Sequence, residues 1–369
     1  MKLLTSFFVG FFLCINLYAG NPVLNKAELR VLDIGNSYSV DATTLLPLIA
    51  KASKSDLSSI CIYRLSRGGA SFKNWVDIYN DNDMTRTYTI TKVVGDLSAN
   101  VQTGKGEKGN GQLFRDALTN EVWDIVIIHQ VSNYAPYYSM WKEKSVAGYL
   151  YELISIIKKH QPNTKIGFLL VHSYWSEYSK NTEKSSFDRW QLIANSTQSF
   201  CDDYNVDIVI PYGTAIQNLR ASSLNNEYDL TRDGTHCGYG LAQYTAACCY
   251  YEALIAPRSG ISVLGNLARI DVSNKTSQYP NVSVTDDNAY IAQMAACLAI
   301  KDMYHCHNPE TDDTQIDLSV VDIYDGVVKD LSGLLIYNLQ GIRKDCFTKG
   351  INIIRQNDGK INKVIKYRQ

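Results

Sequence analysis

The sequence has little excess of charge of either sign. Its 369 residues include 36 Lys and Arg against 37 Asp and Glu, which gives a formal net charge of −1. A protein that binds nucleic acid or anionic lipid over a wide surface needs an excess of basic residues, so we expect no nucleic-acid partner. With 45% hydrophobic and 20% charged residues, the composition also differs from that of disordered, collagen-like or coiled-coil chains.

Long apolar runs are absent beyond the N-terminus, where a membrane-spanning helix would need roughly 18 such residues. The N-terminus itself has Lys2, a nearly continuous apolar stretch over residues 3–18, and the small pair Ala19-Gly20. This arrangement is typical of a secretory signal peptide. We therefore expect residues 1–20 to be removed and the mature protein to be exported to the periplasm, the cell surface or the exterior.

The nine cysteines lack the close, regular spacing of a disulfide framework or a zinc site. Their pairing cannot be read from the sequence. Cys248 and Cys249 lie in a run of small apolar residues with helical spacing, which predicts buried free thiols. No spacing indicates a metal site, and we predict neither a metal nor an organic cofactor.

Five short apolar runs alternate with segments of helical spacing. The runs cover residues 29–34, 59–65, 123–128, 165–171 and 206–210, and the helical segments cover residues 42–52, 146–159, 187–204, 215–221, 239–254 and 286–303. Continuous apolar runs are typical of strands that are covered on both faces. With right-handed crossovers they predict an α/β fold, a three-layer α/β/α sandwich around a five-stranded parallel sheet. Residues 85–94 alternate with period two and predict a small hairpin or flap.

The chain divides into a large α/β domain and a small C-terminal module. We expect the domain to cover residues 21–306, followed by a polar, acidic linker at 307–316. Residues 317–369 are rich in β-forming residues and contain Asn357-Asp358-Gly359, a strong hairpin signal. They predict a small all-β module.

Two short motifs contain residues that suit catalysis. Ligands of parallel sheets bind at the carboxyl ends of the strands, and Ser37 follows the first strand in a tight turn before a helix. Far downstream, Asp233 and His236 are three residues apart in one turn, so the carboxylate can bind one imidazole nitrogen and leave the other for a hydroxyl. Each motif alone also fits a helix cap or a surface histidine.

Together these motifs resemble the SGNH (GDSL-type) hydrolase family, closest to a Bacteroidetes-type branch that begins with Gly-Asn-Ser. The resemblance rests on four blocks, at residues 33–39 (DIGNSYS), 68–71 (GGAS), 123–132 (WDIVIIHQVS) and 233–236 (DGTH). It implies a flavodoxin-like hydrolase fold with Ser37 as nucleophile, His236 as general base and acid, and Asp233 as the residue that orients it. Asn36 replaces the usual Asp beside the nucleophile.

The resemblance also implies an oxyanion hole formed by the backbone N–H groups of Ser37 and Gly69 and by a side-chain amide. The wider family has Gly-x-Asn-Asp where this chain has residues 129–133 (HQVSN), so either Gln130 or Asn133 is the amide donor, with Gln130 preferred. Candidate substrate contacts lie beside the nucleophile and after the fourth strand; they are Tyr38, His172, Tyr174 and Trp175.

The function implied is a secreted serine esterase that removes acyl groups, in particular O-acetyl groups, from carbohydrate. Two alternatives remain open: a non-catalytic glycan-binding protein on the same fold, and a lipase or thioesterase of the same family. Residues 335–341 and 349–354 resemble the sorting domains of type IX secretion, which implies the secretion machinery as a partner of the C-terminal module. A β-module that packs on the enzyme or binds glycan is the other interpretation, and the oligomeric state cannot be read.

Overall fold

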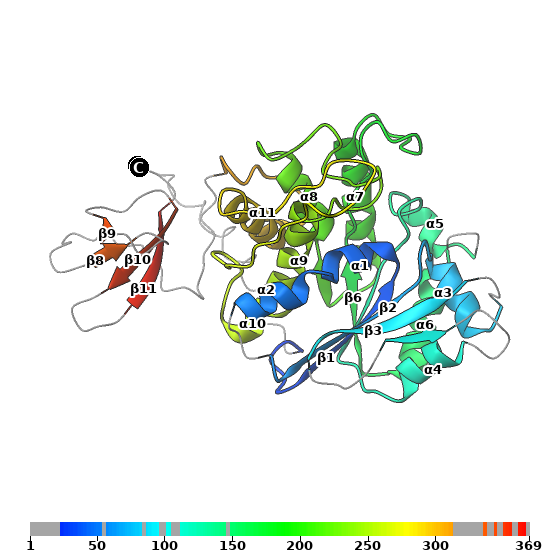
Figure 1. The fold of residues 1–369 in the computed structure, drawn as a ribbon. Coiled ribbons are helices and arrows are strands. Elements are labelled where there is room, and N and C mark those ends of the chain that lie inside the picture. The colour runs from blue at the N-terminus through cyan, green and yellow to red at the C-terminus, as the bar shows by residue number, and fades with distance from the viewer. Residues whose placement is uncertain are drawn as a thin grey trace, which may run out of the picture.

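Figure 1 shows the computed structural model of the protein. It describes residues 23–53, 57–82, 86–95, 101–104, 111–144 and 148–312, together with the backbone of four C-terminal strands at 335–337, 343–344, 350–355 and 361–366. The predicted signal peptide therefore lies outside the described residues, as do most of the C-terminal module and the second part of the predicted linker.

A seven-stranded sheet forms the centre of the molecule. Its strands are β1 (Leu29–Gly35), β2 (Ile60–Ser66), β3 (Tyr88–Val94), β4 (Gln102–Gly104), β5 (Ile125–Ile128), β6 (Lys165–Leu169) and β7 (Ile208–Ile210). They run in the order β4-β3-β2-β1-β5-β6-β7. Within this order, the neighbouring strands from β2 through β1, β5 and β6 to β7 are parallel. Strand β3 is antiparallel to both of its neighbours, β2 and β4. The sheet is thus mixed rather than a five-stranded parallel sheet, because β3, within the segment expected to form a hairpin or flap, extends its edge together with β4.

Helices cover both faces of this sheet (Figure 1). They are α1 (Ser37–Thr43), α2 (Leu46–Ala52), α3 (Phe72–Tyr79), α4 (Gln112–Thr119), α5 (Tyr138–Lys142), α6 (Leu150–His160), α7 (Ser186–Asp203), α8 (Tyr212–Arg220), α9 (Leu241–Leu254), α10 (Ala256–Ser259) and α11 (Ala289–Lys301). Successive strand residues point to opposite faces. In β1, Val31 accordingly packs into the core shared with α1, α8, α9 and α11, and Leu32 into the core shared with α3, α4 and α6. A slip by one residue would exchange these two sets, so both cores fix the register of the strand.

One helical segment differs from its predicted form for a local reason, and another agrees with it. The helix expected at 42–52 is divided into α1 and α2, and Pro47 lies in the first turn of α2, where its missing N–H has no helical acceptor to lose. Helix α9 is buried along almost its whole length. Its Cys248 and Cys249 are buried free thiols, as the apolar run predicted.

The last part of the chain contains a second, antiparallel sheet. Its strands are β8 (Leu335–Tyr337), β9 (Arg343–Lys344), β10 (Gly350–Arg355) and β11 (Ile361–Lys366), in the order β11-β10-β8-β9. Strands β10 and β11 pair on either side of the predicted Asn-Asp-Gly turn, which itself lies outside the described residues.

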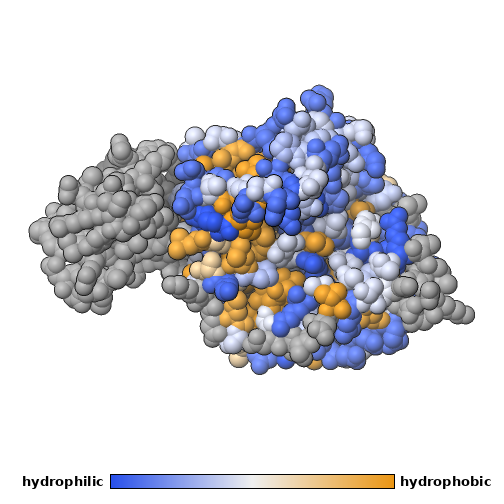
Figure 2. Space-filling model, in the orientation of Figure 1, coloured by the Kyte–Doolittle hydropathy of each residue, from blue (hydrophilic) through white to orange (hydrophobic). Residues whose placement is uncertain are grey.

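The first half of the predicted linker packs on the α/β domain. The backbone N–H of His307 donates to the side chain of Asn218 (2.8 Å), and the Glu310 carboxylate accepts from Ser223. His307 and Glu310, within the predicted linker, thus contact α8 and the residues that follow it. Figure 2 shows a mixed surface, with apolar groups near α2 and α10 and mostly hydrophilic residues over α7 and α8. Among the residues that the structure describes, no helix combines the length and apolarity needed to cross a membrane.

Candidate active site

The turn after β1 is held by the side chain of Asn36. Its amide oxygen accepts from the N–H of Tyr38 (3.0 Å) and so caps the first turn of α1, while its amide nitrogen donates to the carbonyl of Ala70 (3.0 Å). The backbone N–H of Asn36 donates to Nε2 of His129 (3.3 Å), which follows β5. Asn36 therefore joins three strand ends around Ser37, which explains why an amide serves at this position.

The loop at 233–236 is shaped by one carboxylate. Oδ1 of Asp233 accepts from the backbone N–H groups of Thr235 (3.0 Å) and His236 (2.8 Å), as in an Asx turn. Gly234 between them has φ +84°, a left-handed conformation in which a side chain would be strained and would also collide with the ring of Tyr178. This local geometry leaves Oδ2 of Asp233 free to face the imidazole of His236.

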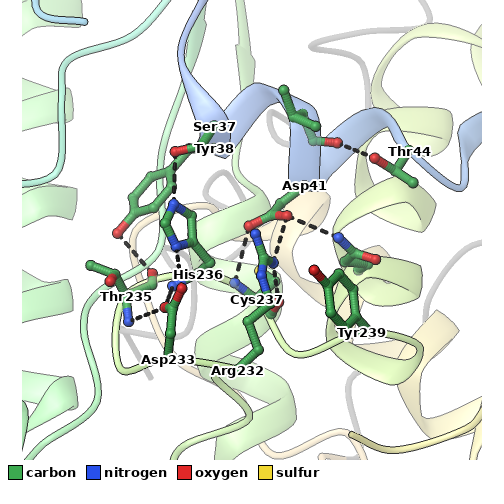
Figure 3. A network of polar contacts seen from close by, with 12 residues as sticks. Ser37, Tyr38, Asp41, Thr44, Arg232, Asp233, Thr235, His236, Cys237 and Tyr239 are labelled. Atoms are coloured by element: carbon green, nitrogen blue, oxygen red, sulfur yellow. Dashed lines mark hydrogen bonds and ion pairs between the residues drawn. The ribbon is translucent and has the colours of Figure 1, made fainter. Parts of the chain in front are cut away.

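Ser37, His236 and Asp233 form one hydrogen-bonded array (Figure 3). Nε2 of His236 lies 2.8 Å from Oγ of Ser37, and Nδ1 lies 2.7 Å from Oδ2 of Asp233. A carboxylate only accepts hydrogen bonds, so Nδ1 carries the proton and Nε2 accepts from the serine hydroxyl. The side chains of His236 and Asp233 are 27% and 35% exposed, so the array is open to solvent.

The Asp233 carboxyl is held in its charged form. Burial alone would raise its pKa, but the hydrogen bonds from the side chain and backbone of His236 and from the N–H of Thr235 outweigh this effect and lower the pKa below its usual value. The carboxylate is therefore ionised at neutral pH and can stabilise a positive charge on His236.

Two of the expected substrate contacts instead support this loop. The carbonyl of Thr235 accepts from the hydroxyl of Tyr38 (2.9 Å) and from Nε2 of His172 (2.8 Å), and both side chains are almost fully buried. Nδ1 of His172 accepts from the hydroxyl of Tyr212 (3.0 Å). Burial lowers the pKa of His172 well below its usual value, so the ring is neutral and this pattern of donors is fixed. Neither ring presents a free face to a substrate.

Two backbone N–H groups of the predicted oxyanion hole lack an acceptor among the described residues, those of Ser37 and Gly69. Gly69 is exposed, in a turn closed by a hydrogen bond from the N–H of Ala70 to the carbonyl of Arg67 (3.1 Å). Its φ of +68° is the left-handed conformation that favours glycine at this turn position.

The two candidate amides have different surroundings. Gln130 is 1% exposed, and its Oε1 accepts from the N–H of Val131 (2.9 Å). Gln130 lies two residues after the end of β5, and Asn36 lies one residue after the end of β1. These two strand ends are neighbours in the sheet, where Ile128 pairs with Ile34. Asn133 is exposed, and its Oδ1 accepts from the hydroxyl of Tyr174. The strand register therefore places the backbone of Gln130 beside the turn that carries Ser37.

The buried side chain of Tyr174 supports the loop after β5. It is 1% exposed, donates to Oγ of Ser132 (2.8 Å), and is covered by the guanidinium of Arg189 at 4.2 Å from its ring centre. Arg189 donates in turn to the carbonyl of Ser132 (2.8 Å). Like Tyr38 and His172, Tyr174 is thus a buried support rather than an exposed contact.

Trp175 is the one partly exposed member of the four expected substrate contacts. Its backbone N–H donates to the carbonyl of Gly234 (2.9 Å), which attaches Trp175 to the loop of His236. Its ring packs against Tyr228 and Tyr279, which stack on each other with ring centres 4.2 Å apart. Three partly exposed aromatic rings therefore adjoin the loop.

Sequence reasoning missed several supporting residues. Tyr212 lies two residues after the end of β7, so the rule that strand ends line a site could have found it. Arg189 lies within α7, and no such rule points to it. His129 is buried, which lowers its pKa to about 3, and it accepts from Asn36 as a neutral structural residue.

Within the described residues, no group of three or more His, Cys, Asp or Glu side chains is arranged to hold a metal ion.

The fold and site define a class: a three-layer α/β protein in which Ser37, after β1, and the loop of Asp233 and His236 form a hydrogen-bonded Ser-His-Asp array. The chain belongs to the family described as a domain of unknown function, DUF4886, whose profile matches residues 30–292. No curated protein matches it by sequence.

Solved structures similar to this chain include a DUF4886 family protein from Bacteroides uniformis. It is 24% identical, with a TM-score of 0.59, and the match covers 76% of this chain and 98% of that one, which shows a shared fold. The chain is less similar to a proposed SGNH hydrolase from Slackia heliotrinireducens, with 19% identity and a TM-score of 0.40; the match covers 61% of this chain and 98% of that one. A proposed GDSL-like lipase from Parabacteroides merdae has 14% identity and a TM-score of 0.35, with 62% and 98% covered.

Proposed function

We propose that this protein is an SGNH-type serine hydrolase that cleaves carboxylic esters. The observation that carries the proposal is the continuous pair of hydrogen bonds from Ser37 through His236 to Asp233 (2.8 and 2.7 Å). A serine hydroxyl is a weak nucleophile until an adjacent base accepts its proton. Here the base, its orienting carboxylate and the hydroxyl are already in hydrogen-bond contact.

The reaction begins with an ester carbonyl against Ser37. As Oγ attacks the carbonyl carbon, its proton passes to Nε2 of His236, and the imidazolium is stabilised by Asp233. His236 then donates this proton to the leaving alcohol, which leaves an acyl group on Ser37. Water, deprotonated by the same imidazole, releases the acid and restores the serine.

The tetrahedral intermediate carries a negative oxygen that needs donors. The N–H groups of Ser37 and Gly69, which have no acceptor among the described residues, are two candidates. The amide of Gln130 is our third candidate because of its position beside the β1 turn, with Asn133 as the alternative. Loss of one donor of this kind typically costs about 10²–10³ in kcat.

We infer that the substrate is an O-acylated carbohydrate. The support is the aromatic group of Trp175, Tyr228 and Tyr279, which is attached to the loop of His236 and partly exposed. Aromatic rings give flat apolar faces with polar edges, which suit the mixed surface of a sugar. The acetyl group is the simplest acyl group consistent with this proposal.

Export is part of the same proposal. The apolar N-terminus with Lys2 and Ala19-Gly20 supports a signal peptide, and an extracellular or periplasmic enzyme would meet glycan esters there. We further propose that the C-terminal module, which contains strands β8–β11, serves as an address for secretion.

The test uses the mature chain from residue 21, with p-nitrophenyl acetate and a fluorophosphonate probe. We expect turnover and labelling by the wild type, and loss of both in Ser37→Ala. The control is Ser39→Ala, because Ser39 lies two residues away on α1 but is buried, with its hydroxyl donating to the carbonyl of Asn36 (3.0 Å). Equal turnover by Ser37→Ala and wild type would refute the proposal.

A glycan-binding protein without catalysis would bind sugars equally well after His236→Ala and would not react with the probe. A lipase or thioesterase would instead prefer long acyl chains, so a series of p-nitrophenyl esters from acetate upward distinguishes it from a deacetylase.

A further inference from the structure

We propose that Asp41 is a positioning residue that holds the loop of Asp233 and His236 against the helix of Ser37. The inference rests on the proposed function, because it assigns a role toward the same array. Asp41 lies on α1 four residues after Ser37, so both side chains project from the same side of the helix one turn apart.

The Asp41 carboxylate binds both ends of the loop. Its Oδ1 accepts from Nη1 of Arg232 (2.8 Å), and its Oδ2 accepts from the backbone N–H of Cys237 (3.1 Å). Arg232 and Cys237 directly precede and follow the segment 233–236. Figure 3 shows the carboxylate between the nucleophile helix and these two residues.

The loop is itself closed at this point. The backbone N–H of Arg232 donates to the carbonyl of His236 (3.0 Å), and Nη1 of Arg232 also donates to the carbonyl of Cys237. The loop is therefore a small closed unit, and a carboxylate that binds Arg232 and Cys237 locates the whole unit rather than one residue. The carbonyl of Thr235, bound by Tyr38 and His172, is a second point of attachment.

The chemistry of the position requires a carboxylate. The three side-chain or backbone groups that reach Asp41 are all donors, the third being Nε2 of Gln243 (2.9 Å). An amide at position 41 would direct its own N–H₂ toward at least one of them. Asp41 is 1% exposed and the side chain of Arg232 is 16% exposed, so water cannot readily replace a lost partner.

The consequence concerns distance at the reacting atoms. Ser37 and His236 are 199 residues apart in sequence, and their 2.8 Å contact depends on how the loop is seated on α1. A displacement of 1 Å caused by a change away from the chemistry can cost about 10² in rate. We therefore expect Asp41→Asn to lower kcat for p-nitrophenyl acetate by about 10²-fold, with KM little changed because Asp41 does not reach the substrate.

Three further variants make the test specific. Asp41→Glu keeps the carboxylate and is expected to restore part of kcat relative to Asp41→Asn. Arg232→Lys keeps the charge but removes the guanidinium whose Nη1 donates to both Asp41 and the carbonyl of Cys237, so it tests the same link if Asp41→Asn does not fold. The control is Thr44→Ala at the end of α1, where the hydroxyl donates only to the carbonyl of Val40 within the same helix; its kcat should equal that of the wild type.

A second readout does not depend on turnover. The proton between Nδ1 of His236 and Asp233 should give a strongly deshielded ¹H NMR signal in selectively ¹⁵N-histidine-labelled protein. We expect this signal to be lost or shifted in Asp41→Asn and Arg232→Lys, but not in Thr44→Ala. An unchanged signal together with unchanged kcat, in variants whose melting temperature has fallen, would assign Asp41 to stability alone and overturn the proposal.

The two proposals can fail separately. If the wild type neither hydrolyses esters nor reacts with the fluorophosphonate, the proposed function is wrong, and the NMR comparison still decides whether Asp41 seats the loop. If the wild type is active and Asp41→Asn retains its full kcat, only the role of Asp41 is refuted.

Discussion

Replacement of Asp233 by Asn is the sharpest test of how the site works. The side-chain oxygen of Asn can still accept from the backbone N–H groups of Thr235 and His236, so the turn is expected to keep its shape. The change is concentrated at Oδ2, which now accepts from Nδ1 of His236 at 2.7 Å. An amide N–H₂ placed there is a donor, and it favours the tautomer of His236 whose Nδ1 is an acceptor.

The magnitude follows from this reversal. With the proton on Nε2, the imidazole faces Ser37 as a donor and cannot accept the serine proton. In Ser-His-Asp enzymes this change lowers kcat by about 10⁴, because the histidine is held in the wrong tautomer. Because Asp233 is partly exposed, we expect the loss of stability to be small compared with the loss of rate.

The assay compares kcat and KM for p-nitrophenyl acetate in wild type and Asp233→Asn. The matched control is Asp302→Asn, since Asp302 and His305 form another Asp-His pair three residues apart, with Nδ1 of His305 2.8 Å from Oδ1. The control should leave kcat unchanged. A loss of less than about tenfold in Asp233→Asn, set against the 10⁴ expected for a triad carboxylate, would refute the assigned role of Asp233.

The pH dependence of stability gives the same pair a second test. The pKa of the Asp233 carboxyl is lower in the folded protein than in the unfolded chain, so its stabilising effect is present above the unfolded value of about 4. This effect is lost as the pH falls from there toward the folded value. Urea unfolding of Asp233→Asn should therefore lose less free energy below pH 4 than the wild type does, and equal losses would contradict the charged hydrogen-bonded form described here.

Three further outcomes are expected. Trp175→Ala should raise KM for an acetylated oligosaccharide by at least severalfold and leave p-nitrophenyl acetate hydrolysis unchanged; equal effects on both substrates would argue against a sugar-binding role. Gln130→Ala should lower kcat by about 10²–10³ and Asn133→Ala by much less, and the reverse order would assign the oxyanion amide to Asn133. Burial raises the pKa of Asp33 to about 7. Since the folded protein then binds this proton more tightly than the unfolded chain, the contribution of Asp33 to stability should fall by about 3 kcal/mol as the pH rises from 4 to 7. Asp33→Asn should flatten this slope in urea unfolding.

Much of the fold follows from the apolar runs. The five runs each contain a strand of the sheet, because a strand covered on both faces is apolar throughout and stands out in the sequence. Strand β3 alternates with period two because it lies near the sheet edge, and this pattern alone fits a separate hairpin or flap as well as a strand of the central sheet. Which of these structures forms depends on the strand with which the segment pairs, and the sequence of one segment does not identify its pairing partner. Helices α3 and α4 are eight residues each, too short for their spacing to separate them from loops.

The site residues divide in the same way. Some can be recognised from the sequence around them, and others cannot. Ser37 and His236 follow strand ends or occupy short motifs, and their chemistry is visible in the residue types alone. Asp41 sits inside a helix, where an acidic residue is ordinarily a solvated surface group, and nothing nearby marks it as 1% exposed.

Its burial is decided by Arg232 and Cys237, which lie more than 190 residues downstream. The same holds for Tyr38 and His172. Their places in the sequence predict substrate contacts, but both side chains donate to the carbonyl of Thr235. In each case a buried polar group is tolerated only because a distant donor or acceptor satisfies it. The 2.8 Å contact between Ser37 and His236 therefore depends on side chains whose partners are set by the closed fold, and we expect substitutions at these positions to change kcat without replacing Ser37 or His236.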